Sequence, residues 1–346
     1  MLRLPAFTLR SPQTLEDAAA ALSSDGAGEG RARVVAGGTD LWPNMKRRHQ
    51  KAETVISLMG IPALRGIRDG NGSGELRLGA TALLDDVARD PAVRARYPAL
   101  ARAVASISSP PLRNMGTIGG NVCVDTRCTY YNQTEEWRRA IDYCLKEEGT
   151  VCWVAPGSSK CWAHSASDSA PVLAALGARI RLVSTAGERV LPVADLHRDD
   201  GIAYLAKTPE EIVAEILLPA EADRAHCRSS FWKLRRRGTI DFAVLSAAVA
   251  LWMNPDGTVA RARIVLGAVA SRPLPVPEAE ALLAGERPSP ELLARAADLA
   301  RRAATPMDNT DFHAHWRGVM VARYTEAALR EAAGLPVERL PPPHSA

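Results

Sequence analysis

The alternation of apolar and polar positions predicts a chain of mixed helices and short strands. A capping-box pattern at Thr14, with Asp17 three residues later, precedes an alanine-rich segment and predicts a helix there. Further helices are expected over 82–89, 92–106, 169–176 (ending at Gly177) and, in segments, 278–333. Strands are expected over 33–35, 54–58, 179–183, 211–218, 242–253 and 261–269. Because helices and strands do not alternate regularly, the pattern predicts an α+β fold.

Residues 122–167 lack this regular patterning. They show little periodicity, yet they hold three of the seven tryptophans and five of the six cysteines. We interpret this segment as an insertion stabilised by something other than an aliphatic core. The proline run at 341–343 begins a polar tail that we expect to be disordered.

Composition and charge exclude several classes of protein. The 346 residues are 47% hydrophobic and 24% charged, with a net charge of +4, so neither a disordered chain nor a strongly basic nucleic-acid binder is expected. No apolar run approaches the roughly 20 residues that span a membrane. The start of the chain lacks the features of a signal peptide, which favours a cytoplasmic globular protein.

Two glycine-rich loops are the first candidates for ligand binding. Adjacent glycines let successive backbone N–H groups point into one concavity, which suits a phosphate, although each loop is also compatible with a plain tight turn. Neither loop has the P-loop or G-x-G-x-x-G pattern, so a conventional ATP or nicotinamide site is disfavoured. Two such loops suit a ligand with two phosphates. The residues are Val34, Val35, Ala36, Gly37, Gly38, Thr39, Asp40 and Leu41 in the first loop, and Thr117, Ile118, Gly119, Gly120 and Asn121 in the second.

The order A-G-G-T-D-L and then T-I-G-G-N resembles the FAD-binding medium subunits of the molybdenum hydroxylases. The resemblance continues through 167–171, 209–212, the Lys233 region and 266–269, and so covers nearly the whole chain. It implies a two-part FAD-binding domain over 1–224, a C-terminal domain of mixed sheet and helices over 225–335, and a tail over 336–346.

The same resemblance implies roles for individual residues toward FAD. The first loop would wrap the pyrophosphate with main-chain amides and the Thr39 hydroxyl, and the second loop would close the other side. Asp168 would accept hydrogen bonds from ribose or ribityl hydroxyls. Ile107 and Val213 would make apolar contacts, and Lys233 would lie near the flavin, where its charge would stabilise reduced flavin.

Four cysteines in the insertion are candidate metal ligands. Cys128, Cys144, Cys152 and Cys161 follow the spacing C-x15-C-x7-C-x8-C. Four thiolates are what a cubane iron–sulfur cluster needs. Zinc also accepts four cysteines but usually shows closely spaced pairs. From spacing alone, a cluster, a zinc site and no metal all stay open.

The residues around these cysteines resemble an extra loop in the β subunits of 4-hydroxybenzoyl-CoA reductases. The residues that carry this resemblance are D-T-R-C-T-Y-Y-N-Q at 125–133, E-W-R at 136–138 and C-W-V at 152–154. In those proteins the loop carries a 4Fe–4S cluster absent from the rest of the family, so the resemblance implies that the four cysteines hold such a cluster.

The resemblance also implies partners and a direction of electron flow. Electrons from ferredoxin would pass through 4Fe–4S and FAD to a small subunit with 2Fe–2S clusters and a large molybdenum subunit, in a dimer of heterotrimers. Catalytic side chains are not expected in this chain, because the cofactors carry the redox chemistry. Two alternatives stay open: the medium subunit of another molybdenum hydroxylase that oxidises an aromatic or N-heterocycle, and a non-redox assembly protein with a zinc-stapled loop.

Overall fold

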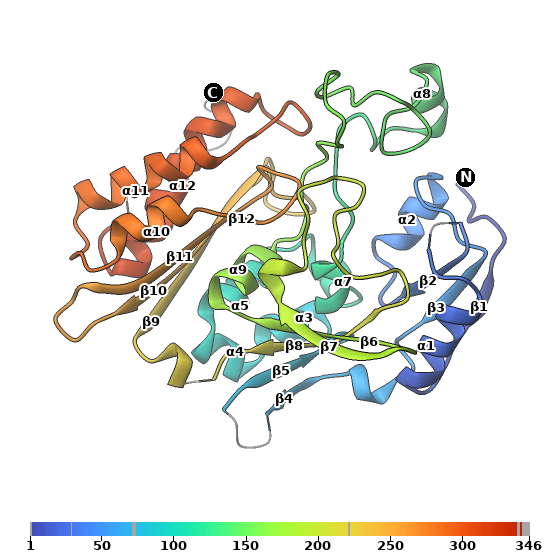
Figure 1. Cartoon of the computed structure of the whole chain (residues 1–346), viewed down its shortest axis with the longest axis horizontal. Coiled ribbons are helices and arrows are strands. Elements are labelled where there is room, and N and C mark those ends of the chain that lie inside the picture. The colour runs from blue at the N-terminus through green and yellow to red at the C-terminus, as the bar shows by residue number, and fades with distance from the viewer. Residues whose placement is uncertain (1, 29, 71–73, 221, 338–339, 341–346) are drawn as a thin grey trace.

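Three β-sheets with their helices make up residues 2–28, 30–70, 74–220, 222–337 and 340, which the computed structural model describes (Figure 1). The first sheet is parallel, with β3 (Thr54–Ser57) between β1 (Thr8–Arg10) and β2 (Ala32–Val35). Helix α1 (Leu15–Ser24) begins as predicted, because the Thr14 hydroxyl accepts a hydrogen bond from the Asp17 N–H at 3.1 Å. The first glycine-rich loop leaves the carboxyl end of β2 and enters α2 (Leu41–Lys46).

The second sheet has five strands in the order β4-β5-β8-β6-β7. These are β4 (Ile67–Asp69), β5 (Leu76–Gly79), β8 (Ile212–Leu218), β6 (Arg179–Ser184) and β7 (Gly187–Pro192), and every residue of the central β8 is buried. The short 3-10 helices η1 (Pro62–Leu64), η2 (Val193–Asp195) and η3 (Ala222–Arg224) lie in the connections.

Short helices cover this sheet and carry the second glycine-rich loop. They are α3 (Leu84–Arg89), α4 (Pro91–Arg96), α5 (Pro98–Ala105), α6 (Pro110–Arg113), α7 (Ile118–Val122) and α9 (Ser169–Leu176). The helix predicted over 92–106 is divided into α4 and α5, because Pro98 cannot continue a helix and starts a new one. Helix α9 ends at Gly177 with φ 78°, as predicted.

The third sheet is antiparallel and lies in the C-terminal third of the chain. Its strands β9 (Cys227–Leu234), β10 (Leu245–Met253), β11 (Val259–Gly267) and β12 (Leu274–Pro275) pack against α10 (Pro277–Leu283), α11 (Pro290–Ala303) and α12 (Ala314–Ala333). Helices α5 and α9 contact the sheet from the preceding part of the chain. The predicted α+β architecture is confirmed.

The segment between α7 and α9 is irregular, as expected for an insertion, and has one helix, α8 (Glu135–Ala140), among its described residues. Figure 1 shows it rising between the N-terminal part and the C-terminal helices, with α8 at its outer end. Backbone hydrogen bonds fasten it to the C-terminal part, from Ser165 N to Ala270 O at 2.9 Å and from Thr129 N to Asn309 O at 2.8 Å.

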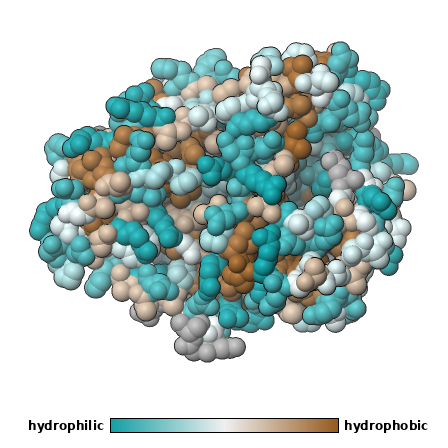
Figure 2. All heavy atoms as spheres, viewed as in Figure 1, coloured by the Kyte–Doolittle hydropathy of each residue, from teal (hydrophilic) through white to brown (hydrophobic). Residues whose placement is uncertain are grey.

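The face seen in Figure 2 is mainly hydrophilic, with separate small hydrophobic patches. In the described part of the chain, none of the helices combines the length and the apolar character needed to cross a membrane. The tail predicted at 341–346 lies outside the described residues.

Candidate functional site

The two glycine-rich loops meet at one cavity of about 420 Å³, a size typical of small-molecule sites. The loop after β2, the start of α7, the turn before α9 and the start of β8 all contribute to its wall. The predicted residues on the wall are Val34, Val35, Ala36, Gly37, Gly38, Thr39, Asp40, Leu41, Ile107, Thr117, Gly119, Gly120, Asn121, Asp168 and Val213. Below, this space is called the flavin cavity.

Glycine is required where the loops cross. A Cβ on Gly37 would lie 1.6 Å from the carbonyl oxygen of Met115, just ahead of the second loop. Gly38 has φ +69°, and a Cβ there would lie 1.9 Å from the indole nitrogen of Trp42. The glycine pair therefore allows the two loops to touch and curves the first loop around the cavity.

The backbone amides of the first loop are open. For Ala36, Gly37, Gly38, Thr39 and Asp40, the described residues supply no acceptor to the N–H groups. Consecutive open amides on a cavity wall are suited to bind an anion, so this loop stays a candidate phosphate site.

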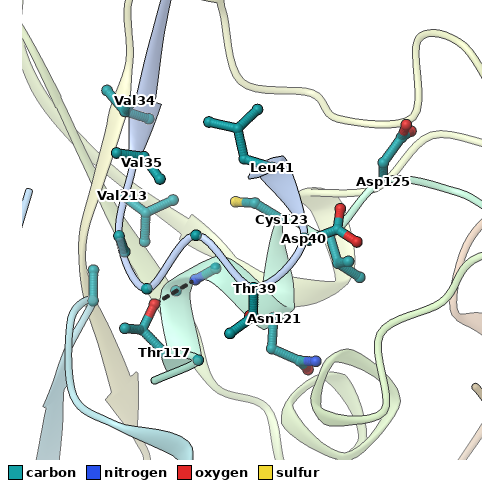
Figure 3. Close-up of a pocket in the computed structure, with 18 of the residues that line it drawn as sticks. Val34, Val35, Thr39, Asp40, Leu41, Thr117, Asn121, Cys123, Asp125 and Val213 are labelled. Carbon is teal, nitrogen blue, oxygen red and sulfur yellow. Dashed lines mark hydrogen bonds between the residues drawn. The ribbon is translucent and has the colours of Figure 1, made fainter. Parts of the chain in front are cut away.

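The second loop differs from this expectation. Ile118 N donates to Ala82 O at 3.0 Å, Gly119 N donates to Ala80 O at 3.0 Å, and Gly120 N donates to the Thr117 hydroxyl at 3.2 Å (Figure 3). A second set of open amides was therefore a wrong expectation. The carbonyls of Ala80 and Ala82 and the hydroxyl of Thr117, the N-cap of α7, accept from these donors, and the loop contributes wall surface instead.

Asn121 ties the second loop to the turn before α9. Its side-chain oxygen accepts hydrogen bonds from the hydroxyls of Ser167 at 3.0 Å and Ser169 at 2.6 Å. This places Asp168, between those serines, on the cavity wall. Ile118 has no place on the wall, because its side chain is fully buried in the core.

Asp168 is a buried carboxylate with one free oxygen. Its Oδ2 accepts a hydrogen bond from Lys233 Nζ at 2.7 Å, and both side chains are 4% exposed. Its Oδ1 is buried without a partner among the described residues. Burial raises the pKa of Asp168, and the Lys233 charge opposes that shift. Asp168 lines the cavity, and a carboxylate with one unused oxygen is suited to accept a hydrogen bond from a ligand hydroxyl.

Lys233 forms an ion pair with Asp168 but does not itself line the flavin cavity. Its ammonium group also donates to Ser106 O at 3.1 Å. Its influence on a ligand therefore passes through the orientation and charge of Asp168.

Several wall residues were not predicted from the sequence, among them Arg33, Lys207 and Tyr204. Arg33 and Lys207 bring positive charge to the cavity, and Arg33 Nε is buried without a hydrogen-bond partner among the described residues. Tyr204 lines the same wall, with its hydroxyl 3.3 Å from Cys123 O. Arg33 directly precedes the first loop in sequence, and this position could have identified it as a candidate binding residue. The stretch around Tyr204 has no motif that would have identified it.

A second, smaller cavity lies in the insertion and is lined by Cys128, Cys144, Cys152 and Cys161. All four are free thiols and no more than 8% exposed. We call this space the cysteine cavity. The backbone N–H of Ala163 donates to the sulfur of Cys161 at 3.4 Å. The predicted ligands are thus brought together on one wall.

Burial raises the pKa of three thiols in this cavity, those of Cys128, Cys144 and Cys161, which favours their protonated form. Desolvation raises the pKa of Cys128 to about 11 and that of Cys161 to about 12. The described residues contain no group of three or more His, Cys, Asp or Glu side chains arranged to hold a single metal ion. Cys123 lies apart from this group, on the wall of the flavin cavity (Figure 3).

The fold and the flavin cavity agree with what comparison with known proteins shows. Residues 5–221 match the family described as the FAD binding domain in molybdopterin dehydrogenase, and residues 229–332 match the CO dehydrogenase flavoprotein C-terminal domain. The chain belongs to the family of FAD-binding medium subunits of the molybdenum hydroxylases. It is therefore an FAD-binding subunit of an oxidoreductase, and the non-redox assembly alternative is wrong.

Particular relatives resemble nearly the whole chain. The carbon monoxide dehydrogenase medium chain of Hydrogenophaga pseudoflava is 28% identical over 95% of this chain and 97% of its own length. The aldehyde oxidoreductase FAD-binding subunit of Escherichia coli is 30% identical over 73% of this chain and 79% of its own. A solved structure of carbon monoxide dehydrogenase from Hydrogenophaga pseudoflava covers 96% of this chain and 99% of its own, with a TM-score of 0.78 and 28% identity.

Proposed function

We propose that this chain is the FAD and 4Fe–4S electron-transfer subunit of a molybdenum-containing complex similar to 4-hydroxybenzoyl-CoA reductase. The supporting observation is that four buried cysteines of the insertion line one cavity, as the resemblance to the extra loop of those reductases implies. The reaction of the complex would be the reductive removal of a phenolic hydroxyl, giving benzoyl-CoA.

The cysteine cavity suits a cluster better than a single ion. The four cysteines line one space, and no three potential ligands among the described residues are arranged for one ion. The Ala163 N–H that donates to the Cys161 sulfur is of the kind that tunes iron–sulfur sites. Because buried thiols must lose their protons to bind metal, filling the site releases protons. Cys128, Cys144, Cys152 and Cys161 would be the ligands.

In the flavin cavity, the open amides of residues 36–40 would hold the pyrophosphate, with Arg33 and Lys207 adding positive charge. Asp168 Oδ1 would accept a hydrogen bond from a cofactor hydroxyl, and Lys233 would keep Asp168 ionised and oriented. Ile107 and Val213 would supply apolar contacts.

When bound, FAD and 4Fe–4S would supply electron storage and transfer, and the chain would hold them in place. The proposal includes ferredoxin as donor, and a small 2Fe–2S subunit and a large molybdenum subunit as partners. It divides the chain into residues 1–224 for FAD, with the insertion, and 225–335 for the C-terminal domain.

The test is the metal and flavin content of the complex purified without oxygen. We expect about four iron atoms and four acid-labile sulfides per chain beyond those of the partner subunits. Cys144→Ser should remove this iron and its EPR signal while FAD stays bound. Cys227→Ser is the matched control, because Cys227 lies on β9 and lines neither cavity. An unchanged cluster signal in Cys144→Ser would contradict the ligand assignment.

A second candidate is a medium subunit of a complex that oxidises N-heterocycles. Relatives with such names include a nicotinate dehydrogenase FAD-subunit from Eubacterium barkeri, 25% identical over 81% of this chain, and a nicotine 6-hydroxylase medium subunit from Paenarthrobacter nicotinovorans, 25% identical over 96%. Turnover of 4-hydroxybenzoyl-CoA with reduced ferredoxin supports the first candidate. Oxidation of nicotinate or nicotine with an artificial acceptor, and no turnover of the thioester, supports the second.

A further inference from the structure

Lys146 connects the two cavities. Among the described residues that line the cysteine cavity, it is the only one with a charged side chain. Its ammonium group lies 2.7 Å from the carboxylate of Asp125, which lines the flavin cavity instead. The cation is therefore at the wall of one cavity and its counter-ion is at the wall of the other.

The position of this ammonium group is closely determined. It donates to Gly201 O at 2.7 Å and to the hydroxyl of Thr126. Its nitrogen also lies 5.0 Å from the ring centre of Tyr131, which lines the cysteine cavity, and 5.5 Å from that of Tyr204, which lines the flavin cavity. The side chains of Lys146 and Asp125 are 6% and 7% exposed, so little water screens the charge.

A buried fixed charge beside a redox group changes the equilibrium of that group. Taking up one electron adds one negative charge, and a nearby cation favours the more negative state. Net charge, hydrogen bonds and solvent exposure are the properties by which proteins set iron–sulfur potentials. Lys146 has the only positively charged side chain among the described residues that line the cysteine cavity.

We propose that Lys146, oriented by Asp125, raises the reduction potential of the group held by the four cysteines and so brings it into range to exchange electrons with the flavin. This inference rests on the proposed function, because it requires an iron–sulfur cluster in the cysteine cavity. The electron comes from the ferredoxin of that proposal, and from dithionite in the experiment below.

The experiment is a potentiometric titration of the intact complex, followed by EPR for the cluster, together with iron, sulfide and FAD analysis. In Lys146→Met we expect the equilibrium constant for one-electron reduction to fall at least about tenfold, a shift of 59 mV to lower potential. The matched control is Lys51→Met. Lys51 forms an ion pair with Glu148 of the insertion at 3.3 Å, but both side chains are 62% exposed, so its removal should leave the potential unchanged.

A second variant guards against a purely structural effect. Lys146→Met leaves Asp125 buried without its cation, whereas Asp125→Asn with Lys146→Met leaves neither charge. The double variant should show a lowered potential as well, but a smaller shift than Lys146→Met, because it also removes the nearby negative charge of Asp125, which disfavours reduction.

The outcomes separate the two proposals. If the cluster of Lys146→Met has the same reduction potential as the wild type, with iron and FAD at wild-type levels, this inference is overturned and the proposed function still stands. Loss of iron in both variants assigns Lys146 a structural role and also overturns it. A wild-type complex that contains FAD but no additional iron overturns the cluster of the proposed function, and the inference falls with it.

Discussion

Replacing Asp168 with alanine separates two roles that the structure gives this residue. Its Oδ2 neutralises Lys233 inside the protein, its Oδ1 has no partner among the described residues, and the residue lines the flavin cavity. Removing the carboxylate should therefore destabilise the fold and, separately, weaken FAD binding.

The magnitude follows from burial. With both side chains 4% exposed, loss of one partner leaves a buried charge without compensation, which costs about 3–5 kcal/mol. We expect the lower end, because Lys233 keeps its hydrogen bond to Ser106 O at 3.1 Å. One hydrogen bond from a ligand hydroxyl to a carboxylate contributes about 1.5–3 kcal/mol, so FAD affinity should fall about 10- to 100-fold.

The assay is urea unfolding of the FAD-free chain, combined with FAD titration followed by flavin fluorescence. Asp168→Ala with Lys233→Met should recover most of the lost stability, since no buried charge is left alone, but should not recover FAD affinity. Lys51→Met, which breaks an exposed ion pair, should change neither quantity measurably. The reasoning is refuted if the double variant is no more stable than Asp168→Ala, or if Asp168→Ala binds FAD as tightly as the wild type.

Three further predictions concern other parts of the chain. Gly37→Ala should abolish FAD binding with the secondary structure retained by circular dichroism, because its Cβ would lie 1.6 Å from Met115 O; unchanged flavin content would show that the loops can separate without loss. Arg317→Met should lower the free energy of unfolding by about 3 kcal/mol or more, because the buried guanidinium donates to the carbonyls of Val244, Ala268 and Met307. A change within 1 kcal/mol would contradict this. Burial lowers the pKa of His164 to about 3 from 6.5, so below pH 6.5 the unfolded chain binds a proton that the folded chain does not. Stability should fall between pH 7 and pH 5 by about 2 kcal/mol from this residue alone, and urea unfolding at both pH values should show a smaller fall in His164→Gln.

Local signals predicted much of the fold. The cap at Thr14 and the end of α9 at Gly177 depend on neighbouring residues, and both were found where expected. The irregular segment at 122–167 was recognised by its missing periodicity. Six strands, β1, β4, β5, β7, β9 and β12, lie outside the predicted ranges. In β1 and β7 the side chains are largely exposed and show no clear alternation.

The roles of site residues were harder to predict. Thr117–Asn121 repeats the glycine pair of the first loop, yet its amides are used within the protein, because α7 forms there and contacts Ala80 and Ala82. Lys233 is close in space to Asp168 but does not reach the cavity wall. Such outcomes depend on which neighbours fold against a loop, and that information is spread over distant residues.

The amino-acid sequence by itself determined the family, the two glycine-rich loops and the set of four cysteines, because residue types at fixed spacing carry that information. Only the tertiary structure decided that one loop keeps its amides open, that Asp168 has a free oxygen, and that Lys146 lies between the two cavities. Each of these depends on burial and on partners far away in the chain, which local pattern does not encode.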